Sequence, residues 1–439
     1  MQYYSTNRQV PPTTFAQAVI DGLAKDKGLF MPEAVPALPA AFFTKLPTLS
    51  LGDIARQVAR PFIENEIPEA VLGQIVEEAL NFPIPLVSLG SHLHVLELFH
   101  GPTLAFKDVG ARFMSRVMAH FLRGVDKKVY VLVATSGDTG SAVAQGFYNV
   151  PGIEVIILYP SGKVSRVQEA QFATLGNNVT ALEIEGTFDD CQRLVKTAFS
   201  DAALREELYL TSANSINFAR LLPQSFYYFY AYGQLAAKVP NPEVVFSVPS
   251  GNYGNLTAGL LAEKMGLPGA AFLAASNAND TVPEYLTTRT FRPRPSVATL
   301  SNAMDVGDPS NFARMQRLFG DSWEDMQRRI KGYSFTDAQT AQAIREVYDT
   351  YGYLIDPHGA VGYLAAADYR RTHPDAHLVV LATAHPAKFA DAVQGATGQV
   401  PPVPPQLGNC LHREKLSLPM ANDYLPLKNF LLQRSVVVS

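Results

Sequence analysis

The sequence predicts an α/β protein with two lobes, each built on a parallel or mixed sheet. Four segments repeat the same order of an apolar, β-branched run, a loop of small residues and a helical stretch. Strands that are apolar along their whole length and alternate with helices are typical of parallel sheets covered on both faces. The four segments are Val129–Phe147, Glu154–Phe172, Glu243–Ala262 and His377–Val393.

The spacing of these segments favours two lobes with a cleft between them. Residues 175–240 separate the first pair of segments from the second pair, which favours two sheets over one continuous sheet. Ligands of such sheets bind at the carboxyl ends of the strands. The loops that follow the four apolar runs are therefore the candidate binding loops.

The chain outside the four segments predicts a helical region at the start and an extension at the end. Phe15–Ile20 and Leu51–Phe62 carry apolar residues at helical spacing. The stretch VPPVPPQ at Val400–Gln406 is typical of a short polyproline connector. We expect an N-terminal helical domain, a smaller α/β lobe, a larger α/β lobe and a C-terminal extension. Their expected bounds are 1–92, 93–210, 211–398 and 399–439.

The composition is that of an ordinary folded enzyme. The chain is 47% apolar and 17% charged, with a net charge of −4, and it has no basic stripe that would predict nucleic acid or a membrane surface as partner. No apolar run reaches the ~18 residues of a spanning helix, and the start MQYYSTNRQV lacks a signal-peptide pattern. We expect a cytoplasmic protein, monomeric or weakly dimeric.

The cysteines and histidines predict neither a disulfide framework nor a metal site. Cys191 and Cys410 lie far apart, and the sequence has no CxxC motif. His92 and His94 share one face of an expected strand near His100, but no further ligand follows at a suitable spacing.

The loop SGNYGN, Ser250–Asn255, is a candidate phosphate site. Gly251 and Gly254 let the backbone turn and approach a ligand, and the loop precedes a helix whose N-terminal N–H groups favour an anion. A tight turn with glycines needed only for packing is an equal alternative. The sequence has neither a Walker loop nor a GxGxxG fingerprint, which disfavours nucleoside triphosphates and NAD.

Two further loops carry groups that bind anions. In ATSGDTGSA, Thr135, Ser136 and Thr139 offer hydroxyl donors, whereas Asp138 would repel an anion. The alternative for this loop is an ordinary helix cap. In TSANSINFAR, the guanidinium of an arginine and two neighbouring polar side chains suit a phosphate, although a surface ion pair is the more common role for such an arginine. These three residues are Asn214, Ser215 and Arg220.

Lys107 lies in FHGPTLAFKDVG, an apolar, bent segment. A lysine among apolar neighbours loses part of its preference for the ammonium form, which makes its amine a better nucleophile and base. It could form a Schiff base with an aldehyde cofactor whose phosphate occupies the SGNYGN loop. Pyridoxal phosphate is such a cofactor. Thr383, in the loop ATAHPAKF after the last apolar run, would face the same cleft, although a structural role is the usual one.

The longer motifs resemble the threonine synthase family, in its enterobacterial and fungal branch. The resemblance rests on FHGPTLAFKDVGARF, ATSGDTGSA, SANSINFAR, VPSGNYGNLTAGL, LSNAMDVGDPSN and TAHPAKF, and extends over nearly the whole chain. It implies a fold-type-II pyridoxal-phosphate enzyme of the tryptophan-synthase β-subunit superfamily. Such an enzyme converts O-phospho-L-homoserine and water to L-threonine and phosphate.

The resemblance also implies roles for the candidate residues. Lys107 would carry the cofactor and move protons, and Thr383 would bond the pyridine nitrogen. The cofactor phosphate would lie against Gly251, Asn252, Tyr253, Gly254 and Asn255. The substrate carboxylate would lie against Thr135, Ser136 and Asp138, and the substrate phosphate against Thr139, Asn214, Ser215 and Arg220.

Two other functions are compatible with part of this pattern. A serine or threonine dehydratase of the same fold would need Lys107 and the glycine loop but no second phosphate site, so Asn214, Ser215 and Arg220 argue against it. A ligand-binding relative without activity would have lost the lysine, which is present here. Many relatives in the superfamily have Asn where this chain has Asp138, so this residue either contacts the cofactor or only supports its loop.

Overall fold

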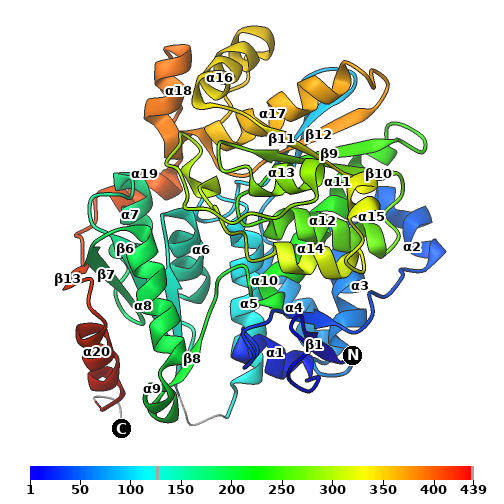
Figure 1. Cartoon of the computed structure of the whole chain (residues 1–439). Coiled ribbons are helices and arrows are strands. Elements are labelled where there is room, and N and C mark those ends of the chain that lie inside the picture. The colour runs from blue at the N-terminus through cyan, green and yellow to red at the C-terminus, as the bar shows by residue number, and fades with distance from the viewer. Residues whose placement is uncertain (125–127, 437–439) are drawn as a thin grey trace.

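The strands of the four repeated segments lie in two separate sheets, as the sequence predicts. The computed structural model describes residues 1–124 and 128–436. In Figure 1 the first sheet lies on the left and the second at the upper right, with helix α5 (Lys107–Phe121) between them. The two-lobed α/β architecture thus follows from the alternation of apolar strands and helices.

The first sheet has five strands, all parallel, in the order β13-β7-β6-β5-β8. Alternate residues along β5 face opposite sides: Val131 and Val133 pack with α5 and α6, whereas Tyr130 and Leu132 pack with α8. Helices therefore cover both faces of this sheet. Its strands are β5 (Val129–Ala134), β6 (Ile153–Pro160), β7 (Val179–Glu185), β8 (Tyr209–Thr211) and β13 (Leu418–Ala421).

The second sheet has six strands in the order β11-β10-β9-β12-β4-β3, and β3 alone runs antiparallel to its neighbour. Phe246 and Val379 pack with α11 and α12, whereas Val245 and Val380 face α16 and α17. Its strands are β3 (Leu86–Ser88), β4 (Leu93–Glu97), β9 (Val244–Pro249), β10 (Ala270–Ser276), β11 (Ile330–Ser334) and β12 (His377–Ala382).

The N-terminal region is a helical layer joined to the core of the protein. A short antiparallel pair, β1 (Tyr3–Ser5) and β2 (Phe30–Pro32), accompanies its helices. The third helix begins at a capping box in which Ser50 and Asp53 bond each other's backbone N–H groups. Its buried face shares one apolar core with α5 and α11. The helices are α1 (Phe15–Asp21), α2 (Ala40–Lys45), α3 (Leu51–Ile63) and α4 (Glu69–Ala79).

The remaining helices cover the two sheets. Those near the first sheet are α6 (Asp138–Phe147), α7 (Arg166–Ala173), α8 (Phe188–Ser200), α9 (Ala202–Glu207), α19 (Pro405–Leu411) and α20 (Tyr424–Val436). Those near the second sheet or between the lobes are α10 (Phe218–Leu221), α11 (Phe226–Ala236), α12 (Gly254–Lys264), α13 (Thr281–Thr288), α14 (Phe312–Leu318), α15 (Trp323–Arg329), α16 (Asp337–Tyr351), α17 (Pro357–Arg370) and α18 (Ala390–Thr397).

The two sheets do not follow the lobe boundaries expected from the sequence. β4 lies within the expected smaller lobe of residues 93–210, yet it pairs with β12 in the six-stranded sheet, and β3 joins the same sheet. At the other end, β13 of the C-terminal extension pairs with β7 of the first sheet. Strands that are neighbours in a sheet can be far apart in the sequence, because long crossovers connect them. The position of β4 in the sequence therefore does not indicate the sheet that it joins. Residues 437–439 of that extension lie outside the described residues.

Candidate active site

Lys107 is the first residue of α5 and follows a turn that is attached to the end of β12. The backbone N–H of Phe106 donates to the carbonyl of Thr383 over 2.9 Å, and that of His385 donates to Leu104 over 3.0 Å. A strand from the second lobe thereby fixes the residue before Lys107. The backbone of Thr383 thus lies next to the residue that precedes Lys107.

Asp108 holds this turn from within. Its carboxylate accepts hydrogen bonds from the backbone N–H of Thr103 over 2.8 Å and from the Thr103 hydroxyl over 2.7 Å. Burial raises the pKa of Asp108 to about 6, against the opposing effect of these bonds. The acidic residue next to Lys107 therefore shapes the turn, and its two oxygens face Thr103.

Lys107 lies in an environment that favours a neutral amine. Burial lowers its pKa to about 8, although the carboxylate of Asp138 acts in the opposite direction. Lys107 Nζ lies 4.0 Å from Asp138 Oδ2, and its side chain is 15% exposed. A large fraction of the amine is then neutral near pH 8, which is what a nucleophile or a base requires.

The first loop, Ala134–Ala142, joins β5 to α6 and uses Thr135 for its own shape. The Thr135 hydroxyl donates to the carbonyl of Gly137 over 3.1 Å, and accepts from the N–H groups of Gly137 and Gly140 over 3.0 and 2.8 Å. Gly137 has a φ of 143°, a conformation that favours glycine. The Thr135 hydroxyl is thus engaged within the loop, whereas Ser136 and Thr139 are half-buried on it.

Asp138 in the same loop is paired with a second lysine that the sequence analysis did not single out. Lys388 Nζ lies 2.7 Å from Asp138 Oδ1, and the Gln168 amide donates to the same oxygen over 2.9 Å. Burial alone would raise the pKa of Asp138, but the ammonium groups of Lys388 and Lys107 hold it well below its usual range. Asp138 is therefore an ionised, buried carboxylate.

The second loop, Ser250–Asn255, joins β9 to α12 and fixes its polar side chains with neutral hydrogen bonds. The Ser250 hydroxyl donates to Asn255 Oδ1 over 2.9 Å, and the Asn255 amide donates to the carbonyl of Pro249 over 2.8 Å. Tyr253 has a left-handed φ of 59°, and its hydroxyl lies 2.5 Å from that of Ser276. Tyr253 and Asn255 thus turn their side chains into the protein.

Gly251 in the second loop is closely covered by the backbone of another segment. A Cβ added at Gly251 would lie 2.6 Å from the Cα atom of Met304. Nearby, Asn252 Oδ1 accepts from the backbone N–H of Ser310 over 2.6 Å. Residues 301–311, from the motif LSNAMDVGDPSN, therefore pack against the loop and require glycine there.

The loop of Asn214 and Ser215 contacts the second loop. The Asn252 amide donates to the Ser215 hydroxyl over 2.7 Å, and the Asn311 amide donates to it over 3.3 Å. The Oδ1 atom of Asn214 is buried, with no hydrogen-bond partner in the described part of the chain. These two predicted loops are thus in direct contact.

Arg220 is a buried cation beside α5. It is 3% exposed and donates to the carbonyl of Ala213, while its Nε atom has no hydrogen-bond partner among residues 1–124 and 128–436. A Cβ added at Gly110, one helical turn after Lys107, would lie 3.1 Å from that Nε atom. No carboxylate within the described ranges forms an ion pair with Arg220.

Arg314 is a second buried arginine, and it was not among the residues predicted from the sequence. Its guanidinium donates to the carbonyls of Phe30 (3.0 Å), Ser215 (3.2 Å) and Ile216 (2.6 Å). It thus anchors the loop of Ser215 to the N-terminal region. One signal was present in the sequence, because Asn-Phe-Ala-Arg occurs twice, at 217–220 and at 311–314.

The histidines considered for a metal are used elsewhere. His94 Nε2 lies 3.3 Å from His377 Nδ1, and His100 Nε2 lies 2.6 Å from a carboxylate oxygen of Glu97. Among the residues that the structure describes, no group of His, Cys, Asp and Glu could hold a metal ion.

None of the described helices is long and apolar enough to cross a membrane. Cys191 and Cys410 are free and buried.

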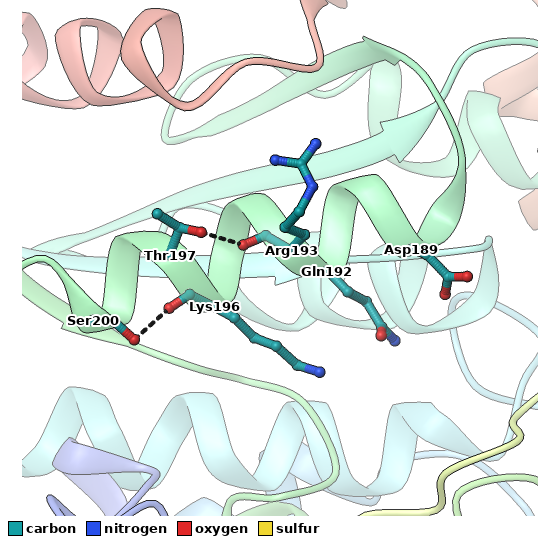
Figure 2. Close-up of a pocket in the computed structure, with 6 residues that line it drawn as sticks. All are labelled: Asp189, Gln192, Arg193, Lys196, Thr197 and Ser200. Carbon is teal, nitrogen blue, oxygen red and sulfur yellow. Dashed lines mark hydrogen bonds between the residues drawn. The ribbon is translucent and has the colours of Figure 1, made fainter. Parts of the chain in front are cut away.

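A surface pocket of about 510 Å³ lies along α8, away from these loops (Figure 2). The hydroxyls of Thr197 and Ser200 donate to backbone carbonyls of the same helix. α8 covers the face of the first sheet opposite to α5, so this pocket does not belong to the site of Lys107. The residues that line it are Asp189, Gln192, Arg193, Lys196, Thr197 and Ser200.

Comparison with known families covers nearly the whole chain. Residues 81–384 match the family described as pyridoxal-phosphate dependent enzyme. Residues 2–80 match the threonine synthase N terminus, and residues 359–431 match the threonine synthase C-terminal family. The first two matches meet where the N-terminal helices end, after α4, and the third begins within α17 and overlaps the end of the longest match.

Individual threonine synthases align with this chain over nearly their full length. The threonine synthase of Haemophilus influenzae is 45% identical over 433 residues, which cover 99% of this chain and 100% of that protein. The crystal structure of threonine synthase from Escherichia coli has a TM-score of 0.92 and 42% identity, covering 99% of this chain and 100% of the other. A threonine synthase from Brucella melitensis described as PLP-bound has a TM-score of 0.92 and 36% identity, covering 99% of each chain. The chain belongs to the threonine synthase family of pyridoxal-phosphate-dependent enzymes.

Proposed function

We propose that this protein converts O-phospho-L-homoserine and water to L-threonine and phosphate, with Lys107 as the amine that carries pyridoxal phosphate. Membership of the threonine synthase family supports this reaction. The proposal rests on Lys107 and Arg220, which lie on one side of α5. Lys107 is an amine with a lowered pKa. Arg220 is a buried cation that has no carboxylate partner in the described chain. The first suits the cofactor and the second suits a phosphorylated substrate.

The residues present fit pyridoxal phosphate. The 11-residue helix α12 begins at Gly254, so its first N–H groups and its dipole favour a phosphate at the second loop. The close backbone approach at Gly251 leaves no room for a side chain there. We infer that the loop from Gly251 to Asn255 holds the cofactor phosphate through backbone N–H groups and Asn252, because Tyr253 and Asn255 point into the protein.

When bound, pyridoxal phosphate supplies an electron sink that spreads negative charge from the α-carbon of an amino acid. Lys107 Nζ then has two tasks, to hold the cofactor and, once released, to take and return protons at the substrate carbons. A pKa of about 8 suits both directions of transfer near neutral pH. The hydroxyl of Thr383 is suited to bonding the pyridine nitrogen without the full charge that a carboxylate would bring.

The substrate would lie between the first loop and α10. We infer that Ser136 and Thr139, with the N–H groups of their loop shaped by Thr135 and Asp138, receive the substrate carboxylate or phosphate. Arg220, with Asn214 and Ser215, would receive the substrate phosphate. A buried guanidinium is costly to leave uncompensated, so an anionic substrate group would gain strongly from binding beside it.

A dehydratase of the same fold remains the second candidate, and the products separate the two. Its substrates, serine or threonine, carry no phosphate, so Arg220 would have no partner during catalysis. We expect phosphate release from O-phospho-L-homoserine to exceed ammonia release from threonine by orders of magnitude in kcat/KM. The opposite ratio would assign the protein to the dehydratases.

Absorbance measurements test the cofactor assignment. The purified protein reconstituted with pyridoxal phosphate should absorb in the visible range, and Lys107→Ala should lose this band. A colourless wild-type protein would contradict the proposal.

Kinetics test the substrate assignment. Arg220→Ala should raise KM for O-phospho-L-homoserine at least tenfold and leave cofactor loading intact, because the lost contact is to the substrate phosphate. Arg193→Ala, on the far face of the first sheet, is the matched control and should change neither quantity. Loss of cofactor in Arg220→Ala would mean that the two phosphate sites are interchanged.

A further inference from the structure

Lys388 is a completely buried lysine that connects the two lobes. It lies in the short helical turn Pro386–Phe389 after β12, and its side chain has no exposed surface. Its Nζ atom is 2.7 Å from Asp138 Oδ1 and donates to the carbonyl of Thr103 over 2.8 Å. Asp138 follows β5 of the other sheet, and Thr103 belongs to the turn before Lys107. Lys388 thus contacts both the turn before Lys107 and the loop that faces it.

The two carboxylate oxygens of Asp138 face two different lysines. Oδ1 is occupied by Lys388 and by the amide of Gln168, at 2.7 and 2.9 Å. Oδ2 faces Lys107 Nζ at 4.0 Å, which is beyond hydrogen-bond distance. Without Lys388, only the neutral amide of Gln168 would hold Oδ1, and the unneutralised carboxylate could move into a close ion pair with the Lys107 ammonium. Such a pair would stabilise the protonated amine, the form that cannot act as a nucleophile.

We propose that Lys388 is a positioning residue for Lys107: it holds Asp138 by one oxygen and neutralises its charge, so that the carboxylate orients the Lys107 amine without trapping it as ammonium. This inference rests on the proposed function, in which Lys107 is the reactive amine. It gives Asp138 a definite role, as the link between a structural lysine and the reactive one. It also explains why an acidic residue lies in a loop that otherwise favours anions.

Other charged groups face Lys107 and bear on the test. The guanidinium of Arg220 acts in the same direction as Lys388, and the carboxylate of Asp356, at the start of α17, acts in the same direction as Asp138. Asp108 follows Lys107 in sequence, but its oxygens accept from Thr103. These groups are unchanged in the variants below, so differences between variants report on Lys388 and Asp138.

The experiment measures the reactivity of Lys107 directly, in the full-length chain freed of cofactor. Trace labelling with acetic anhydride between pH 6 and pH 10, followed by mass spectrometry of the Lys107 peptide, gives the pH at which half of the amine is reactive. Lys388→Met should move this midpoint up by about one pH unit, because Asp138 is then unopposed. Asp138→Asn should move it down by about one pH unit.

Two further variants make the test specific to charge. Asp138→Asn/Lys388→Met removes one charge of each sign and should return the midpoint close to that of the wild type. Lys388→Arg keeps the charge and should do the same. Gln168→Leu removes a neutral donor from the same Asp138 oxygen and is the matched control, with a much smaller shift expected. A merely structural role for Lys388 would not produce opposite shifts in the two single variants.

Folding of the variants is checked by circular dichroism. If Lys388→Met fails to fold, the comparison is made between Asp138→Asn and the double variant, which contains no unpaired buried charge at this site. A lower midpoint in Asp138→Asn than in the double variant supports the proposal. An unchanged or lowered midpoint in Lys388→Met, or equal midpoints in the second comparison, overturns it.

The labelling requires neither cofactor nor substrate, so its outcome is separate from that of the proposed function. A protein whose Lys107 midpoint responds as expected, but which shows no visible absorbance with pyridoxal phosphate, would overturn the proposed function and leave the role of Lys388 standing. A protein that shows visible absorbance with pyridoxal phosphate, but whose Lys107 midpoint does not respond as expected, would overturn the role of Lys388 and leave the proposed function standing.

Discussion

The two strand-to-helix loops of the site differ in how they stabilise buried polar groups. In the first loop, after β5, the carboxylate of Asp138 is buried between Lys388 and Lys107. In the second loop, after β9, Ser250 and Asn255 bond each other and the backbone, and no charged side chain takes part. Both loops lie at the carboxyl end of a parallel strand, where ligands of such folds bind.

This difference indicates a division of tasks between the lobes. The loop with charges is the one that faces the amine of Lys107, the group that we propose moves protons. The neutral loop leaves the N-terminal N–H groups of α12 as its main electrostatic feature, which suits an anion that is held throughout the reaction. Removing a single charged partner in the first loop should therefore lower the free energy of unfolding strongly. In the second loop, the larger losses of stability should come from side chains that collide with a neighbouring segment.

The largest effect is expected from Asp138→Ala. It leaves Lys388 as a buried cation with only the carbonyl of Thr103 as partner, which costs about 3–5 kcal/mol of unfolding free energy. Urea denaturation followed by circular dichroism measures this loss. The double variant Asp138→Ala/Lys388→Met should recover most of it, and equal losses in the single and double variants would contradict the charge argument.

The next effect is expected from Gly251→Ala in the neutral loop. The added Cβ would lie 2.6 Å from Met304 Cα, so the segment 301–311 has to shift, at a cost of about 1–3 kcal/mol. Gly254→Ala is the matched control, because its Cβ would lie 3.3 Å from Ser215 Cβ. Unfolding midpoints in urea should fall clearly for the first variant and little for the second. Equal midpoints would show that the close approach is not limiting.

A smaller effect is expected from Ser250→Ala. The variant loses one neutral hydrogen bond to Asn255 Oδ1, which still accepts from the backbone N–H of Leu256 over 3.0 Å. The cost should be about 1 kcal/mol in the same denaturation assay. A loss as large as that of Asp138→Ala would mean that the two loops do not differ in the way described.

The smallest effect is expected in the acid dependence of stability. The pKa of Asp138 is held below its usual range in the folded protein, so its contribution is present above about pH 4 and is lost as pH falls further. At pH 4 the loss is about 0.4 kcal/mol, since the unfolded carboxyl is then about half protonated. The double variant Asp138→Asn/Lys388→Met should lack this loss, whereas Ser250→Ala should retain it. Stability measured by urea at pH 7 and pH 4 checks both.

The predictions from sequence succeeded where the chemistry is local. The strand-to-helix segments and the positions of the loops around Gly251 and Asp138 follow from periodicity and from residue types that are adjacent in the chain. The charged partners of these loops were harder to predict. Lys388 was present in ATAHPAKF and Arg314 in a second Asn-Phe-Ala-Arg, but nothing adjacent in the chain gives their partners, which lie 250 and 99 positions away.

The structure also changed the reading of several candidate side chains. Thr135, Tyr253 and Asn255 lie in the predicted loops, yet their polar groups are bonded within the protein. Whether a hydroxyl faces a ligand or its own backbone depends on the conformation of one loop, and the residue type is compatible with both.

The sequence by itself determined the α/β class and the two lobes, and it predicted Lys107 as the reactive amine and the loops after β5 and β9 as anion-binding loops. Apolar periodicity and glycine positions act over a few residues, so they can be recognised without the fold. The tertiary structure alone decided that β4 lies in the second sheet, that Arg220 lies beside α5 without a carboxylate partner among the described residues, and that Lys388 reaches Asp138 across the lobes. All three bring together segments that are far apart in the sequence, and burial makes the pair of Lys388 and Asp138 decisive because a buried charge requires a partner.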